Sequence, residues 1–171
     1  MSEERAKRIK LLIMDVDGVL TDGRIIYGPD GSEFKSFHVR DGHAMKLANR
    51  AGLKMAIITG RDSEIVTRRG KELEVDFIYQ KVFNKLEVYE KILQENNLKD
   101  EEIAFIGDDI VDLPVMRRVG LSIAVEDAVE ELKQESLLIT KNPGGRGAVR
   151  EVIEYILKAR GLWEDVTKRY Y

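Results

Sequence analysis

Two aspartates lie one residue apart, directly after a short apolar run near the amino terminus. The run covers residues 11–14, and Asp15, Asp17 and Gly18 follow it. An unbroken apolar run is typical of a strand that is buried on both faces, and such a strand cannot hold an unpaired charge within its length. The aspartates are therefore expected where the strand leaves the sheet, which is where open α/β sheets bind ligands. On this segment alone, a turn or helix-capping role for both residues is equally open.

Other polar side chains that could hold a cation or an anion follow later apolar runs: Thr59, Lys85, Asp108 and Asp109. Carboxylates that converge on one point cannot all ionise without a compensating cation. The chain has no cysteine, so a hard cation with oxygen ligands is indicated, and Mg²⁺ fits an open site of this kind. A lysine and a hydroxyl group beside Mg²⁺ are suited to holding a phosphoryl group.

Two carboxylates in unlike surroundings are the minimum set of acid and base for phosphoryl transfer, with the metal ion neutralising the phosphoryl oxygens. One carboxylate can attack phosphorus and form an aspartyl-phosphate. The second can protonate the leaving alkoxide and then activate water. The pair Asp15 and Asp17 therefore predicts a phosphoryl-transfer site, provided that the later polar residues reach it.

The elements that must position these residues alternate along the chain. Apolar runs predict strands over 11–14, 54–60, 75–79, 102–109, 121–125 and 137–140, the last at a sheet edge. Helical spacing predicts helices over 42–51, 62–72, 84–96, 110–119 (broken or bent near Pro114), 128–134 and 148–160. This alternation predicts an α/β fold with a doubly wound, Rossmann-like parallel sheet. One exception is a β-hairpin over about 24–38, with a turn at 28–31, inserted after the first strand.

Length and composition limit the classes of protein to consider. At 171 residues the chain is expected to form one domain, 1–171. A net charge of -3 without a basic stripe argues against a nucleic-acid partner, and no apolar run has the length of a membrane span. The absence of cysteine and of a signal-peptide pattern predicts a cytoplasmic protein.

Four segments, in order along the chain, resemble the motifs of the haloacid dehalogenase-like phosphatase superfamily: Asp15-Val16-Asp17-Gly18-Val19, Thr59-Gly60, Lys85 and Gly107-Asp108-Asp109-x-x-Asp112. The resemblance implies that Asp15 is the nucleophile and a Mg²⁺ ligand, and that Asp17 is the general acid/base and a ligand through its backbone carbonyl. It implies that Asp108 is the third protein ligand. It also implies that the phosphoryl group is held by Thr59, Gly60 and Lys85. Asp109 and Asp112 would orient either metal-bound waters or the lysine.

Within this superfamily, the chain resembles the capless family of 3-deoxy-D-manno-octulosonate 8-phosphate phosphatases, which hydrolyse a sugar-acid phosphate on the route to lipopolysaccharide. The resemblance rests on segments 39–42, 58–61, 107–109, 113–116 and 144–151. It implies these substrate-binding positions: His38, Val39, Arg40, Asp41, Gly42, Lys46, Arg61 and Arg69. Many members have Asn in place of His38 and Arg in place of Lys46.

Basic residues near these motifs could pair with the carboxylate of such a substrate, and bidentate Arg suits that task. The candidates are Arg40, Lys46, Arg61 and Arg69, each of which could instead be a solvated surface residue. The glycine-rich segment 144–147 could hold an anion or simply begin the last helix, and we favour a site role for Arg146.

A short hairpin cannot bury its apolar side alone, and a site without a cap is open to water. Members of the resembled family form tetramers in which hairpins join and C-terminal tails reach a neighbour's site. The resemblance therefore implies a homotetramer in which the hairpin and the tail 161–171 contribute to neighbouring sites. Three alternatives remain: a phosphatase of a nine-carbon, sialic-type sugar acid, a receiver-type signalling domain, and a non-catalytic oligomerisation module.

Overall fold

The central sheet is organised around the buried strand β1, Leu11–Met14. In the computed structural model, which describes residues 2–171, β1 pairs in parallel with β4 (Lys54–Ile58) on one side and β6 (Ile103–Gly107) on the other. The sheet is completed by β5 (Phe77–Tyr79), β7 (Leu121–Ala124) and β8 (Leu138–Ile139). The strand order is β5-β4-β1-β6-β7-β8, and each neighbouring pair is parallel. The predicted doubly wound α/β fold is confirmed, with β8 at the expected edge.

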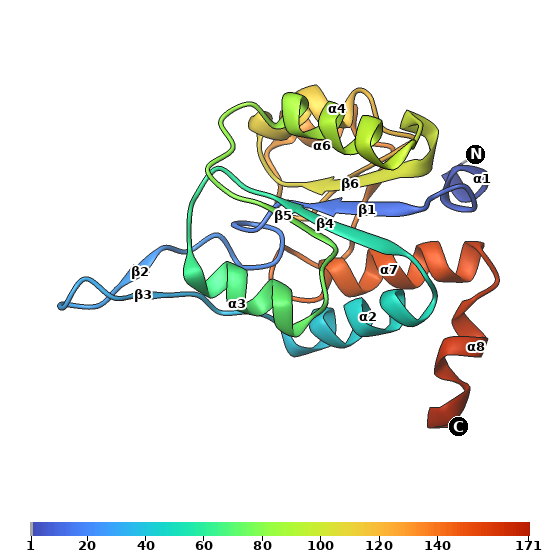
Figure 1. Cartoon of the computed structure of the whole chain (residues 1–171), viewed down its shortest axis with the longest axis horizontal. Helices are drawn as coiled ribbons and strands as arrows, with labels where there is room; N and C mark the ends of the chain where they lie inside the picture. The colour runs from blue at the N-terminus through green and yellow to red at the C-terminus, as the bar shows by residue number, and fades with distance from the viewer. Residues whose placement is uncertain (1) are drawn as a thin grey trace.

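Helices cover both faces of this sheet (Figure 1). One layer contains α2 (Val39–Arg50), α3 (Glu64–Glu72) and α7 (Ala148–Ala159). The other contains α4 (Lys85–Asn96), α5 (Leu113–Met116) and α6 (Glu130–Glu135). Apolar side chains on both sides of the sheet form its core, as they do in parallel sheets generally.

The expected helix over 110–119 is divided in two. A 3₁₀ turn, Ile110–Asp112, comes first, and α5 begins at Leu113 with Pro114 in its first turn. Proline fits there because the first N–H groups of a helix have no intrahelical partner. The predicted break near Pro114 is therefore confirmed.

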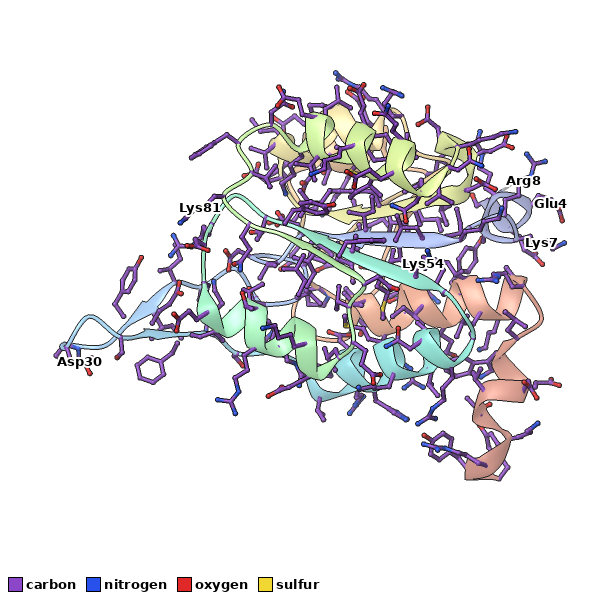
Figure 2. All side chains as sticks on the ribbon, viewed as in Figure 1. Glu4, Lys7, Arg8, Asp30, Lys54 and Lys81 are labelled. Carbon is purple, nitrogen blue, oxygen red and sulfur yellow. The ribbon has the colours of Figure 1, made fainter. Side chains whose placement is uncertain are left out.

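A hairpin follows β1, as predicted, but its regular pairing is short. The strands β2 (Ile26–Tyr27) and β3 (Glu33–Phe34) are antiparallel. The hairpin projects beyond the carboxyl end of the sheet (Figure 1), and Asp30 lies at its tip (Figure 2). The side chains of Ile26, Tyr27 and Phe34 are exposed, so the hairpin leaves apolar surface uncovered.

The two ends of the described chain are more ordered than the sequence indicated. A short helix, α1 (Ser2–Ala6), precedes β1, and the tail contains α8 (Trp163–Thr167) and a 3₁₀ turn, Lys168–Tyr170. The hydroxyl group of Tyr170 contacts Nε2 of His43 and accepts a hydrogen bond from Arg50, both on α2 and both at 3.0 Å. The tail thus packs on its own chain, at the end of the molecule opposite to the hairpin (Figure 1). Within residues 2–171, no helix combines the length and apolar character that crossing a membrane requires.

Candidate active site

Three neighbouring strands deliver polar side chains to one edge of the sheet. Asp15 follows β1, Thr59 follows β4 and Asp108 follows β6. The register places Met14 beside Ile57 and Ile106, so the three strands end almost level. The chain runs to β4 on one side of β1 and later to β6 on the other side, which makes this edge the switch point where such sheets bind ligands.

Carboxylates converge at this edge. Asp15, Asp108 and Asp112 each place one carboxylate oxygen within 4.8 Å of the others. Burial, opposed in part by Lys85, raises the pKa of Asp15 to about 6. Burial and the nearby negative charge of Asp15 raise the pKa of Asp108 to about 7. Excess negative charge on a compact set of oxygen ligands is suited to a hard divalent cation, so the residues present fit Mg²⁺.

Lys85 is the counter-ion of the cluster. It opens α4 directly after the N-cap residue Asn84, whose side chain accepts a hydrogen bond from the backbone of Leu86. The Lys85 ammonium is buried, 2.8 Å from Oδ2 of Asp15 and 2.6 Å from Oδ1 of Asp112. These two carboxylates raise the pKa of Lys85 despite its burial, and the side chain therefore stays charged.

The structure separates the roles of Asp109 and Asp112, which the sequence left open. Asp112 is fully buried, and its two oxygens accept hydrogen bonds from Lys85 and from the backbone of Asp108. Asp109 is exposed, and its carboxylate accepts from the backbone of Ile110 at the start of the 3₁₀ turn. Asp112 thus contacts Lys85 directly, whereas Asp109 caps a turn and makes no such contact.

The glycine-rich segment 144–147 supports the loop that follows Asp17. The backbone N–H of Gly145 donates to the carbonyl of Val19 at 2.8 Å. A Cβ atom on Gly144 would lie 1.7 Å from the carbonyl oxygen of Gly18, so only glycine allows this approach. The Arg146 side chain is exposed. The segment therefore has a packing role at the site that the sequence did not indicate.

Gly18 itself allows a second close approach. Its φ is +90°, and a Cβ atom there would lie 2.0 Å from a carboxylate oxygen of Asp108. The positive φ favours glycine at this position, and the absence of a side chain also leaves room for the carboxylate of Asp108, a residue 90 positions later in the chain.

The Asp17 carboxylate contacts two basic side chains, one of which belongs to the hairpin. Nζ of Lys35 is 2.5 Å from Oδ1 of Asp17, and Nε of Arg61 is 3.7 Å from Oδ2. Arg61 also donates to Glu33 at 2.9 Å and to the Tyr27 hydroxyl at 3.1 Å. Arg61 is the predicted substrate-binding residue that the structure brings against a catalytic candidate.

Sequence reasoning missed Lys35, although a signal was present. Strand alternation places Glu33, Lys35 and Phe37 on one face of the segment 32–39 and Phe34 on the other. Phe37 packs against the core and Phe34 is exposed, so the odd-numbered face points to the body of the protein. The pattern therefore predicts that Lys35 points inward.

The other predicted substrate-binding residues divide into two groups. His38, Asp41, Gly42 and Arg69 line a narrow crevice beside the hairpin. Each of its polar members has a buried side-chain atom without a hydrogen-bond partner within residues 2–171: Nδ1 of His38, Oδ2 of Asp41 and Nε of Arg69. Buried polar atoms of this kind are commonly paired with an ordered water molecule or an ion. For another group, the structure shows no hydrogen bond or ion pair with the carboxylate cluster among the described residues: Val39 and Arg40 are exposed, and Lys46 pairs with Glu74 at 2.9 Å.

Comparison with known proteins agrees with this geometry. Residues 72–153 match the family model of the haloacid dehalogenase-like hydrolases, a class whose chemistry the aspartate cluster fits. The 3-deoxy-D-manno-octulosonate 8-phosphate phosphatase KdsC of Escherichia coli (strain K12) is 45% identical over 161 residues, which is 94% of this chain and 86% of the relative.

Solved structures give the same result. The 3-deoxy-D-manno-octulosonate 8-phosphate phosphatase of Moraxella catarrhalis, in complex with magnesium ion, phosphate ion and a KDO molecule, matches with a TM-score of 0.97 and 41% identity, covering 99% of this chain and 97% of that one. The Yersinia pestis phosphatase of the same name matches with a TM-score of 0.94 and 43% identity, over 95% and 88% of the two chains. The chain belongs to the family of 3-deoxy-D-manno-octulosonate 8-phosphate phosphatases, within the haloacid dehalogenase-like hydrolases. This membership overturns the receiver-domain alternative.

Proposed function

We propose that this protein is a Mg²⁺-dependent phosphomonoesterase that hydrolyses 3-deoxy-D-manno-octulosonate 8-phosphate to the free sugar acid and phosphate, in lipopolysaccharide biosynthesis. The observation that carries the proposal is the cluster of Asp15, Lys85, Asp108 and Asp112, in a chain 45% identical to a curated phosphatase of this name. The exposed fraction of Asp15 is 7%, so the nucleophile that we propose is largely shielded from water.

The reaction that we propose has two steps on Asp15. In the first, a carboxylate oxygen of Asp15 forms a bond to phosphorus, the bond from phosphorus to the sugar oxygen breaks, and Asp17 gives that oxygen a proton. In the second, water attacks phosphorus, returns a proton to Asp17, and releases phosphate and the Asp15 carboxylate. Mg²⁺, held by Asp15, Asp108 and the backbone carbonyl of Asp17, would neutralise charge on the phosphoryl oxygens.

Three further residues serve the phosphoryl group in this proposal. Thr59 is buried at the end of β4 and would donate a hydrogen bond through its hydroxyl group, next to the backbone of Gly60. Lys85 already touches Asp15 and supplies positive charge there. Its contact with Asp112 fixes its position, which limits the reorganisation needed as negative charge develops.

Phosphate release from a panel of substrates tests the proposal. The panel contains 3-deoxy-D-manno-octulosonate 8-phosphate, a nine-carbon sialic-type phosphate and simple hexose phosphates, each with Mg²⁺ or with a chelator. We expect the highest kcat/KM for the eight-carbon acid, a requirement for Mg²⁺, and no turnover by Asp15→Asn. If the nine-carbon acid phosphate gives the highest kcat/KM, it is the substrate in place of the eight-carbon one. Absence of turnover with every ester would support a non-catalytic module.

We also propose a cytoplasmic homotetramer in which the hairpins of neighbouring copies pack together. The exposed Ile26, Tyr27 and Phe34 side chains support this assembly, because an isolated two-stranded hairpin is marginal in water. Light scattering should report four chains for the wild type and fewer for Phe34→Asp. A wild type that is monomeric at assay concentration would contradict the proposal.

The tail 161–171 serves a neighbouring site in this assembly. It lies at the end of the molecule opposite to the hairpin, so its own site is out of reach (Figure 1). For a variant that ends at residue 162, we expect a higher KM for the substrate and a circular dichroism spectrum that shows an intact fold. An unchanged KM would contradict a role for the tail at a neighbouring site.

A further inference from the structure

Lys35 has surroundings that are unusual for a residue on an exposed hairpin. The exposed fraction of its side chain is 1%, although the residue as a whole is half-buried and the neighbouring Phe34 is exposed. An ammonium group buried to this extent is costly unless it is paired with carboxylates. Its carboxylate partners are Asp17 at 2.5 Å and Glu33 at 3.7 Å.

The contact with Asp17 is specific to one oxygen. Among the described residues, Lys35 is the side chain that hydrogen-bonds to the Asp17 carboxylate, through Oδ1. The Oδ2 atom has Arg61 at 3.7 Å, which is too long for a hydrogen bond. Arg61 donates instead to Glu33 and Tyr27, so it is tied to the hairpin.

We propose that Lys35 is a positioning residue for the general acid/base Asp17. The inference rests on the phosphatase function proposed above. Because the Lys35 ammonium donates to Oδ1, the carboxylate cannot rotate freely, and Oδ2 is the oxygen left to exchange a proton with the substrate. The hairpin thus contributes to the chemical step within its own chain, in addition to any contact with a neighbouring copy.

A proton transfer depends steeply on the placement of the acid. General acid–base catalysis contributes typically 10²–10⁴-fold, and a displacement of about 1 Å can remove roughly 10²-fold. Loss of the contact between Lys35 and Asp17 should therefore lower the rate of hydrolysis of esters whose leaving oxygen needs a proton. An aryl ester such as p-nitrophenyl phosphate releases a stabilised phenolate and needs no proton donor.

The test compares these two classes of substrate in Lys35→Met and Lys35→Arg. For the sugar-acid phosphate, we expect Lys35→Met to lower kcat/KM by roughly 10²-fold. For p-nitrophenyl phosphate, we expect a decrease of less than about threefold. Lys35→Arg keeps a donor of similar reach and should restore part of the loss. The control is Lys54→Met, which removes the same charge at the amino end of β4, away from the hairpin (Figure 2).

A double substitution distinguishes action through Asp17 from a general effect on the site. In an Asp17→Asn background, Lys35→Met should have little further effect, because the two residues act as a unit. Equal losses with both esters, or additive losses in the double variant, would overturn the proposal. If Lys35→Met does not fold, Lys35→Gln is measured in the same way, and the same outcomes apply. A wild type that hydrolyses neither ester would refute the phosphatase function itself, a result separate from any effect of Lys35.

Discussion

We expect the ionised side chain of Asp108, the proposed Mg²⁺ ligand, to destabilise the protein when no metal ion is bound. Burial and the charges of Asp15 and Asp112 raise the pKa of Asp108 from 3.8 to about 7. A group whose pKa is raised by folding contributes stability below its unfolded pKa and loses it as the pH rises through the folded pKa. Without a metal ion, the ionisation of Asp108 therefore opposes folding increasingly above pH 3.8, and the full cost is reached above about pH 7.

The size of this effect follows from the shift of about three pH units. At roughly 1.4 kcal/mol a unit, the full cost is roughly 4 kcal/mol. Since Asp108 keeps partial contact with solvent, screening lowers this value. The side chain of Asn has the same shape, and the Asp108 carboxylate accepts no hydrogen bond from the described residues that Asn would lose. We therefore expect Asp108→Asn to raise the free energy of unfolding by about 2–4 kcal/mol at pH 8, and by about half of that at pH 5.5.

Urea unfolding at equilibrium, with EDTA and at one protein concentration, measures the difference. Adding Mg²⁺ should stabilise the wild type by about 2.7 kcal/mol at a hundredfold excess over its Kd, and the variant by much less. Phosphatase activity should be lost in the variant despite its higher stability. A metal-free variant no more stable than the wild type at pH 8 would refute the reasoning, as would a difference that grows at pH 5.5.

Two further substitutions examine the supports of the site. Lys85→Met leaves the carboxylates of Asp15 and Asp112 without their counter-ion. We therefore expect the free energy of unfolding to fall by about 3–5 kcal/mol and kcat to fall by at least roughly 10²-fold. A stable, active variant would contradict the assigned role. Gly144→Ala forces a Cβ atom against the carbonyl of Gly18. Urea unfolding should therefore show a free energy of unfolding lower by about 1–3 kcal/mol, and kcat should fall although residue 144 bears no reactive group. Wild-type values for both quantities would refute this account.

The local sequence pattern was enough to predict those strands and helices in which apolar residues follow one clear spacing. The apolar run 11–14 predicted a buried strand, which the structure has, and the aspartates lie where this strand ends, as expected. The position of Lys85 at the start of a helix followed in the same way from the helical spacing of residues 84–96. Boundaries were less accurate in the hairpin, because two-residue strands make too few cross-strand pairs to extend regular pairing.

Contacts between distant segments could not be derived from such patterns. The difference between Asp109 and Asp112 depends on how the 3₁₀ turn directs one carboxylate to Lys85 and leaves the other in solvent. The packing of segment 144–147 on the loop after Asp17 is also invisible in either segment alone. The contact of Asp112 with Lys85 joins residues 27 positions apart, and the contact of Gly145 with Val19 joins segments more than a hundred residues apart.

The sequence by itself determined the alternation of strands and helices and the residue types at each strand end. Because parallel strands bring their carboxyl ends to one edge, these two facts were enough to predict Asp15, Thr59 and Asp108 in one site. The tertiary structure decided which charges pair there. Asp112 holds Lys85, and Lys35 reaches Asp17 from the hairpin, because the direction and burial of a side chain depend on the packing of the whole chain around it.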